Sequence, residues 1–114
     1  MKADVPNQLC SLFWEATLRC NAYCEFCGSR CGDYSAKTLK DEELSAEIIC
    51  NCFREIAHAY DSQSIMLNIT GGEPLLRQDL FDIMAYASNL GFPWGLVSNG
   101  SLIDETNVKK MKAS

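Results

Sequence analysis

Apolar residues group along the chain into short runs that alternate with segments of helical periodicity. Three of the runs are compact and rich in aliphatic and aromatic residues, as in strands buried in a sheet. They span Leu9–Thr17, Ser64–Thr70 and Phe92–Ser98. The near-continuous apolarity of the second run favours a parallel strand that is covered on both faces. The pattern therefore predicts a sheet built from segments far apart in the sequence.

An amphipathic helix is expected over Ala46–Ala59. Ser45 is its predicted N-cap, because the serine hydroxyl can accept from a free amide of the first turn. Apolar residues recur on one side of this segment at helical spacing and are expected to face inward. They are Ile48, Ile49, Cys52, Phe53, Ile56 and Ala57.

Two further helices are predicted after the second and third strands. One spans Gln78–Leu90, and Gly91 is its expected stop. The other begins after Asp104 and reaches the end of the chain. The residues expected to face inward are Leu80, Phe81, Met84 and Ala87 in the first of them, and Val108 and Met111 in the second.

The order of strands and helices indicates the fold class. Helical crossovers between strands make a sheet parallel, so the chain is predicted to be α/β with three strand–helix units. Ligands of such sheets gather at the carboxyl ends of the strands. The segments that follow the three strands are the cysteine-bearing loop Leu18–Lys37, Gly71–Pro74 and Ser98–Gly100. These three segments are therefore expected to converge on one edge.

Composition narrows the classes of partner. The chain has 114 residues, which fits one domain over 1–114, and a net charge of −5 from 10 Lys+Arg against 15 Asp+Glu. Nothing in it resembles the basic stripe that binds nucleic acid. No apolar run approaches the roughly 20 residues of a membrane span. Because the N-terminal residues lack a signal-peptide core, the expected compartment is the cytoplasm.

The chain contains seven cysteines, an odd number that argues against a disulfide framework and favours metal binding or catalysis. Cys10 is expected in the core. Cys50 and Cys52 are two positions apart on a helix and cannot share a face, so neither is assigned to a metal. The remaining four fall in one loop and are Cys20, Cys24, Cys27 and Cys31.

Cys20, Cys24 and Cys27 have the spacing C-x3-C-x2-C. Thiolates are soft ligands that suit iron–sulfur clusters or zinc. Structural zinc sites and ordinary electron-transfer clusters take four protein ligands, whereas three close cysteines match three corners of a cubane. The alternative is a buried helical stripe of small apolar residues that also includes Cys31. The glycines at positions 28 and 32 would weaken such a helix.

The motif resembles the C-x3-C-x-aromatic-C signature of the radical S-adenosylmethionine (SAM) superfamily, with Phe26 as the aromatic residue. The resemblance implies that Cys20, Cys24 and Cys27 hold a 4Fe-4S cluster. It also implies that the amino and carboxylate groups of SAM chelate the fourth iron, and that Phe26 lies beside the adenine. Cys31 is outside the motif and is expected to be a bystander.

Gly71-Gly72-Glu73-Pro74 follows the second predicted strand. Glycines permit positive φ and close approach to a ligand, and Pro74 biases Glu73 toward an extended conformation. A carboxylate there can pair with an ammonium group. Taken alone, the segment also fits a plain turn between a strand and a helix. It resembles the GGE motif of the superfamily, which implies that Gly71, Gly72 and Glu73 bind the amino group of SAM.

Ser98-Asn99-Gly100 resembles the T-N-G often found after the third strand in this superfamily, with serine in place of threonine. The resemblance gives Asn99 a contact with SAM or the substrate. Asn-Gly pairs are as common in ordinary turns, so a purely local role is the alternative.

The resemblance implies an oxidoreductase-type reaction. A donor such as flavodoxin or ferredoxin supplies one electron, SAM is cleaved reductively, and the resulting 5′-deoxyadenosyl radical abstracts hydrogen from a substrate. The protein positions the cofactors. The sequence of residues 27–32 (Cys-Gly-Ser-Arg-Cys-Gly) resembles members with C-terminal SPASM auxiliary-cluster domains, several of which act on peptides or proteins.

A complete core of this family has about six strand–helix units in a partial (β/α)6, TIM-like barrel. The chain is expected to form its N-terminal half and to be catalytically incompetent or very weak by itself. The alternative is an iron–sulfur or zinc-binding module for electron transfer or structure, with Cys31 as the fourth ligand and no radical chemistry.

Overall fold

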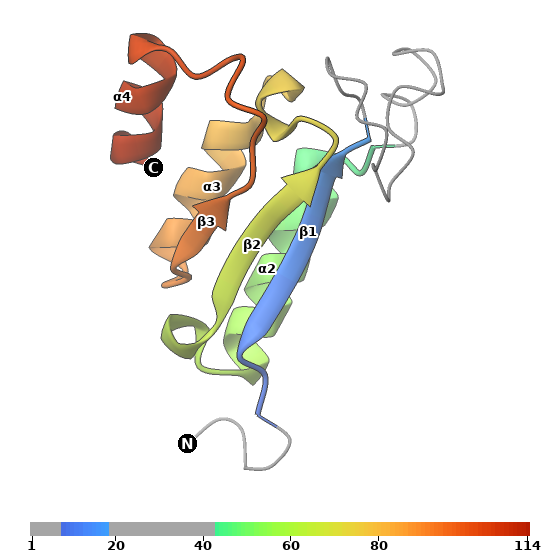
Figure 1. Ribbon diagram of the computed structural model, residues 1–114. Coiled ribbons are helices and arrows are strands. Elements are labelled where there is room, and N and C mark those ends of the chain that lie inside the picture. Colours follow the sequence, from blue (N-terminus) through green and yellow to red (C-terminus); the bar gives the residue numbers. More distant parts are fainter. Residues whose placement is uncertain (1–7, 19–42) are drawn as a thin grey trace.

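The computed structural model describes residues 8–18 and 43–114 of the chain. The predicted alternation of strands and helices is confirmed in this part of the chain (Figure 1). The elements are β1 (Ser11–Thr17), α2 (Ala46–Ala59), β2 (Met66–Gly71), α3 (Leu80–Asn89), β3 (Trp94–Leu96) and α4 (Glu105–Ala113). Short 3-10 turns, η1 (Ser62–Ser64) and η2 (Pro74–Leu76), precede and follow β2.

The three strands form a parallel sheet in the order β1-β2-β3. Phe13 is paired with Asn68, and Asn68 with Gly95, so the strands are in register across the middle of the sheet. A helix links each strand to the next. The predicted α/β class with a parallel sheet is therefore confirmed.

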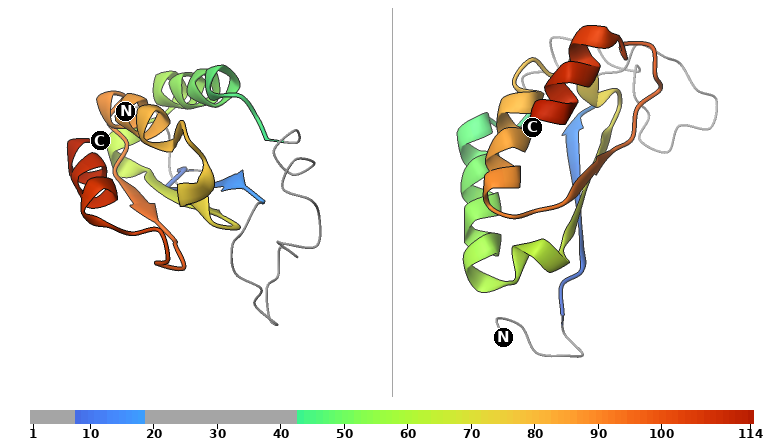
Figure 2. Two further views of the ribbon diagram at one scale, coloured as in Figure 1. Left: turned by 90° about the horizontal axis from the view of Figure 1, so that it is seen from above. Right: turned by 90° about the vertical axis from the view of Figure 1, so that its left-hand side faces the viewer.

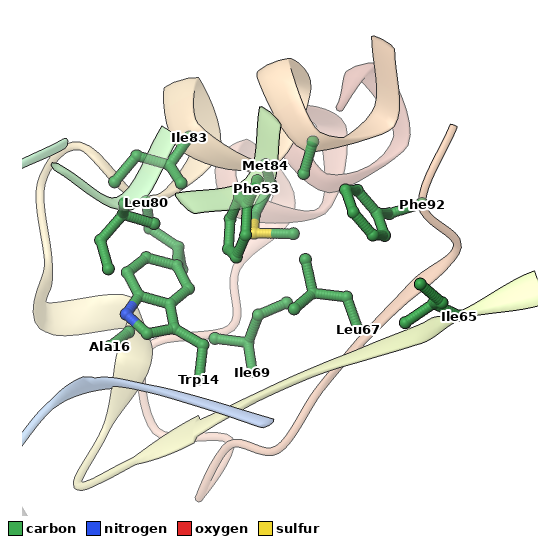
Figure 3. Close-up of a cluster of buried hydrophobic side chains, with 12 residues drawn as sticks. Trp14, Ala16, Phe53, Ile65, Leu67, Ile69, Leu80, Ile83, Met84 and Phe92 are labelled. Carbon is green, nitrogen blue, oxygen red and sulfur yellow. The ribbon is translucent and has the colours of Figure 1, made fainter. Parts of the chain in front are cut away.

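Helices α2 and α3 lie side by side on one face of the sheet (Figure 2). The core fills the space between these helices and the strands (Figure 3). Trp14 of β1 meets Phe53 of α2 edge to face at 5.9 Å between ring centroids, a favourable aromatic geometry. The fully buried aliphatic residues of the core include Ile65, Leu67, Ile69, Leu80, Ile83 and Met84.

The opposite face of the sheet is exposed. Phe13 is 70% exposed, Val97 63% and Met66 39%. In β2 the buried residues Leu67 and Ile69 alternate with Met66, which is exposed. The prediction that this strand is covered on both faces is wrong for the described residues, because both packed helices lie on the same side.

The predicted helix boundaries are largely confirmed. The Ser45 hydroxyl accepts from the amide of Ile48 at 3.3 Å and caps α2. Gly91 follows α3 with a φ of +101°, which glycine adopts readily. Asp104 caps α4 by accepting from the amide of Asn107 at 2.8 Å. In the described residues, no helix has both the length and the apolar character needed to cross a membrane.

The inward face of α2 is narrower than predicted. Ile49 and Phe53 are buried, but Ile48 is 49% exposed and Cys52 is also exposed. Ile48 and Cys52 each precede a core residue by one position, which turns them about 100° away from the sheet. The core assignment of Cys10 is wrong too, since Cys10 is exposed just before β1.

Helix α3 and strand β3 are shorter than expected. α3 begins at Leu80, and Ile83 takes the buried position expected for Phe81, which is only half-buried. β3 begins after Pro93, which has no amide proton to donate to the sheet, although its carbonyl accepts from Leu67 at 2.8 Å. In α4, Val108 and Met111 are half-buried, and no residue of this helix is fully buried.

Candidate functional site

The carboxyl ends of the three strands meet at the upper edge of the sheet in Figure 1. β1 ends at Thr17, β2 at Gly71 and β3 at Leu96. The turns after β2 and β3 contact each other directly through Glu73 and Ser98. The predicted convergence is confirmed for these two turns.

Gly71 allows β1 and β2 to approach closely at this edge. Its φ is +133°, and a Cβ atom there would lie 2.2 Å from the carbonyl oxygen of Thr17. The amide of Gly72 donates to that same oxygen at 2.7 Å. The pairing also shifts register between Glu15 and Thr17. A glycine at position 71 is therefore needed for packing between the two strands. This reason is separate from the predicted close approach of a ligand.

Glu73 is fully buried, and its carboxylate joins the two turns. It accepts from the amide of Leu75 at 3.0 Å, from the amide of Asn99 at 2.7 Å and from the hydroxyl of Ser98 at 2.8 Å. Its backbone is extended, at φ −116° and ψ 102°, as Pro74 predicts. The side chain is therefore held in one position from both turns.

The donors around Glu73 do not saturate its carboxylate. A carboxylate offers about four acceptor positions. The two amides and the single hydroxyl proton of Ser98 occupy three of these positions. Among the described residues, no cationic side chain pairs with Glu73. Burying an unpaired carboxylate is costly, so the position suits a cationic ligand group.

Asn99 makes a local turn in the structure. Its side-chain oxygen accepts from the amide of Ser101 at 2.9 Å and from the Ser101 hydroxyl at 2.7 Å. Gly100 adopts a φ of +84° and donates its amide to Ser98 at 3.0 Å. The local role of the Asn-Gly pair is thereby shown. A contact between Asn99 and a cofactor stays a prediction.

Arg77 is a second buried charge, 5% exposed, beyond the glycine turn. Its guanidinium donates to the carbonyl of Ala16 at 2.9 Å and to the carbonyl of Leu44 at 2.6 Å. It pairs with Asp79 at 2.6 Å, and it lies over the ring of Trp14, 5.2 Å from the centroid. Each of the three guanidinium nitrogens therefore has an acceptor, and one face of the group lies over an aromatic ring.

The flanks of the cysteine segment also contact each other. The Thr17 hydroxyl donates to the carboxylate of Glu43. A shallow cavity of about 180 Å³ lies beside this pair, lined in part by Leu18 and Leu44. The residues predicted to hold the cluster and the adenine fall outside the described part of the chain. They are Cys20, Cys24, Phe26 and Cys27, and the same holds for Cys31.

Of the described cysteines, Cys10, Cys50 and Cys52 are free thiols. Burial raises the pKa of the Cys50 thiol, the nearby Asp79 carboxylate raises it further, and Arg77 partly offsets the rise. A higher pKa leaves less thiolate, which is the form that binds metals. The environment of Cys50 therefore agrees with leaving it out of the predicted ligand set.

Sequence reasoning missed the roles of Arg77, Thr17 and Glu43. Arg77 stands between Leu76 and Gln78, where a charged residue is usually read as exposed. The one available signal was Asp79, an opposite charge two positions away. That signal does not reveal the carbonyl groups of Ala16 and Leu44, which come from distant parts of the chain.

Comparison with known proteins decides the family. The model of the radical SAM superfamily matches residues 14–114. The chain belongs to the radical SAM superfamily. The resemblance drawn from the cysteine and glycine motifs is thereby confirmed.

Two relatives of this radical SAM chain carry names that describe enzymes. An AdoMet-dependent heme synthase from Nitratidesulfovibrio vulgaris is 30% identical over 103 residues, covering 89% of this chain and 26% of that protein. An Fe-coproporphyrin III synthase from Methanosarcina barkeri is 34% identical over 99 residues, covering 87% of this chain and 23% of that protein. The chain thus spans about a quarter of the length of these relatives.

Proposed function

We propose that this chain forms the N-terminal part of a radical SAM core, and that it binds a 4Fe-4S cluster and SAM for a one-electron reaction. The observation that carries the proposal is the buried Glu73 carboxylate, which has neutral donors and no cationic partner among the described residues. This carboxylate lies at the carboxyl edge of the sheet in a chain of that superfamily.

The amino group of SAM is the cation that Glu73 is proposed to receive. One acceptor position of the carboxylate is left after its three donors are counted. The Ser98 hydroxyl turns about a single bond, so it can also yield its place to an incoming ammonium. A salt bridge between two opposite charges would then replace a hydrogen bond from a neutral hydroxyl, and the salt bridge is the stronger interaction. Gly71 and Gly72 would shape the turn around the bound group.

The cluster is assigned to Cys20, Cys24 and Cys27 on the spacing of these residues and on membership of the superfamily. Bound together, the cluster and SAM supply the one-electron chemistry that gives a 5′-deoxyadenosyl radical. Phe26 is proposed to lie beside the adenine, and Asn99 to contact SAM or the substrate. A small electron-transfer protein such as flavodoxin or ferredoxin is the proposed electron donor.

The exposed sheet face is proposed to line the interior of a partial (β/α)6 barrel. Phe13 and Val97 are more than half exposed on that face, and the relatives are about four times as long as this chain. Residues beyond the described strands would complete the barrel and most of the substrate pocket. We therefore expect the isolated chain to release little 5′-deoxyadenosine. The two relatives are named as synthases of heme and of Fe-coproporphyrin III, and these names do not support a peptide substrate.

The proposal is tested by anaerobic reconstitution of the chain with iron and sulfide, followed by electron paramagnetic resonance (EPR) of the dithionite-reduced protein during a SAM titration. The reduced-cluster signal should change as SAM binds. Glu73→Gln should need at least ~10-fold more SAM for half of this change, because a neutral amide replaces the carboxylate. Glu47→Gln, an exposed change on α2, is the control. A signal indifferent to SAM, or a colourless zinc protein, would contradict the proposal.

A further inference from the structure

The Arg77 guanidinium joins two points of the chain that are far apart in sequence. The carbonyls of Ala16 and Leu44 accept from its two terminal nitrogens at 2.9 Å and 2.6 Å. Ala16 precedes the cysteine-bearing segment, and Leu44 follows it. The intervening residues contain all three cysteines of the superfamily motif, Cys20, Cys24 and Cys27.

A second pair reinforces this closure. Thr17, which is 2% exposed, donates its hydroxyl to Glu43, and its carbonyl accepts from Gly72 at 2.7 Å. The two ends of the segment are therefore tied to each other and also to the glycine turn. Holding the ends of a long segment together removes chain entropy before any ligand binds.

The arrangement requires an arginine. A guanidinium has five N–H donors in a rigid plane and can serve two carbonyls and a carboxylate at once, whereas a lysine ammonium is a single point of charge. Asp79 fixes the plane through Nε at 2.6 Å and Nη2 at 3.3 Å. The Trp14 ring supports its face at 5.2 Å. Rotation of the guanidinium would break several of these contacts together.

We propose that Arg77 is a positioning residue that clamps both flanks of the cysteine segment and thereby sets the place of the iron–sulfur cluster relative to the Gly71–Glu73 turn. The clamp stands on contacts within the chain. Its effect on the cluster rests on the proposed function. The η2 turn lies between the two residues: Glu73, proposed to receive SAM, directly precedes it, and Arg77, proposed to hold the cysteine segment, directly follows it.

The clamp is tested first without iron. Hydrogen–deuterium exchange of the apo chain should show ~10-fold faster exchange in Arg77→Lys at the end of β1 and at the first turn of α2, because local opening follows the loss of the bridging contacts. Amides of α4 should be unchanged. Arg54→Lys, the same substitution at an exposed position of α2, is the matched control. If Arg77→Lys does not fold, Asp79→Asn loosens the same clamp while keeping the guanidinium.

The effect on the cluster is read by spectroscopy. Outer-shell partners of metal sites typically contribute 10–100-fold to metal affinity or activity. We therefore expect reconstituted Arg77→Lys to need ~10-fold more SAM than the wild type for half of the change in the EPR signal. Arg54→Lys should titrate as the wild type does. The EPR signal comes only from molecules that hold the cluster. A general loss of stability would lower the size of this signal, but it would not change the SAM concentration at half of the signal change.

The outcomes separate this inference from the proposed function. If the wild type takes up the cluster and responds to SAM while Arg77→Lys titrates identically, the positioning role is refuted and the proposed function stands. If the wild type takes up no iron, the proposed function fails. The clamp is then tested by hydrogen–deuterium exchange of the apo chain alone. Unchanged exchange in Arg77→Lys would overturn the clamp in either case.

Discussion

Glu73 and Arg77 stand at the two ends of the η2 turn, and both are buried, yet their charges are balanced in different ways. Arg77 has its own counter-ion in Asp79 and two carbonyl partners on distant segments. Glu73 accepts only from neutral donors of the described chain. A buried charge that already has a counter-ion stabilises the fold. A buried charge that accepts only from neutral donors can still bind a ligand of opposite charge. This difference supports the proposed structural task of Arg77 and the proposed binding task of Glu73.

The largest effect is expected at Gly71, where β1 and β2 approach each other closely. Gly71→Ala should lower the free energy of unfolding by about 4 kcal/mol, because a strained φ adds to a clash with the Thr17 carbonyl. Gly100 is the matched control: its φ is +84°, but nothing lies within 4 Å of an added Cβ. Gly100→Ala should cost about 1 kcal/mol, the strain of the left-handed backbone alone. Urea denaturation of both variants measures this, and equal losses would contradict the close approach at Gly71.

The Glu73 half of the comparison is tested by removing its carboxylate. Glu73→Ala should cost about 3 kcal/mol, since it leaves the Leu75 and Asn99 amides and the Ser98 hydroxyl without an acceptor. Glu73→Gln keeps the shape and one acceptor oxygen, so it should cost about 2 kcal/mol. The same denaturation experiment measures both values. If added SAM stabilised Glu73→Gln as strongly as the reconstituted wild type, the binding task would be assigned to the wrong residue.

The Arg77 half is tested through its counter-ion. Asp79→Asn should cost about 1.5 kcal/mol, because a salt bridge to a 4% exposed guanidinium becomes a hydrogen bond to a neutral amide. The control pair is Lys109 with Glu105, which are 73% and 85% exposed at 3.3 Å. Glu105→Gln should change stability by less than about 0.5 kcal/mol, as is usual for exposed pairs. Thermal unfolding measures the stability of both variants. Equal losses would contradict the contrast between the buried and the exposed ion pair.

The smallest effect is expected at Ser98, which supplies one of the three donors to Glu73. Ser98→Ala should cost about 1 kcal/mol for the lost hydrogen bond. Ser98→Thr keeps the hydroxyl and should stay within about 0.5 kcal/mol of the wild type. A threonine variant as unstable as the alanine variant would show that the hydroxyl contact is unimportant.

Several features of the fold could be predicted because they depend on local chemistry. The Ser45 cap, the Gly91 stop and the extended backbone of Glu73 before Pro74 each follow from one residue and its neighbours. The parallel sheet follows from the order of strands and helices. The meeting of the glycine turn with the Ser98 turn follows from that topology, so this edge of the sheet could be predicted from the sequence.

Other features depend on contacts between distant segments and could not be predicted. Ile48 and Cys52 fit the apolar stripe of α2, but the width of the stripe that packs is set by where the sheet lies. Arg77 looks like a surface residue until Ala16 and Leu44 are brought beside it. The requirement for Gly71 likewise comes from the Thr17 carbonyl of another strand. In each case the deciding partner is remote in the sequence.

The central claim is that three cysteines of one motif hold a cluster whose remaining iron is open to SAM. Iron and sulfide content after anaerobic reconstitution of Cys24→Ala, beside Cys31→Ala as the matched control, tests it most directly. The account predicts that Cys24→Ala loses most of its iron, whereas Cys31→Ala retains about as much as the wild type. Equal iron in Cys24→Ala and the wild type, or loss of iron in Cys31→Ala, would contradict the account and favour a four-cysteine site.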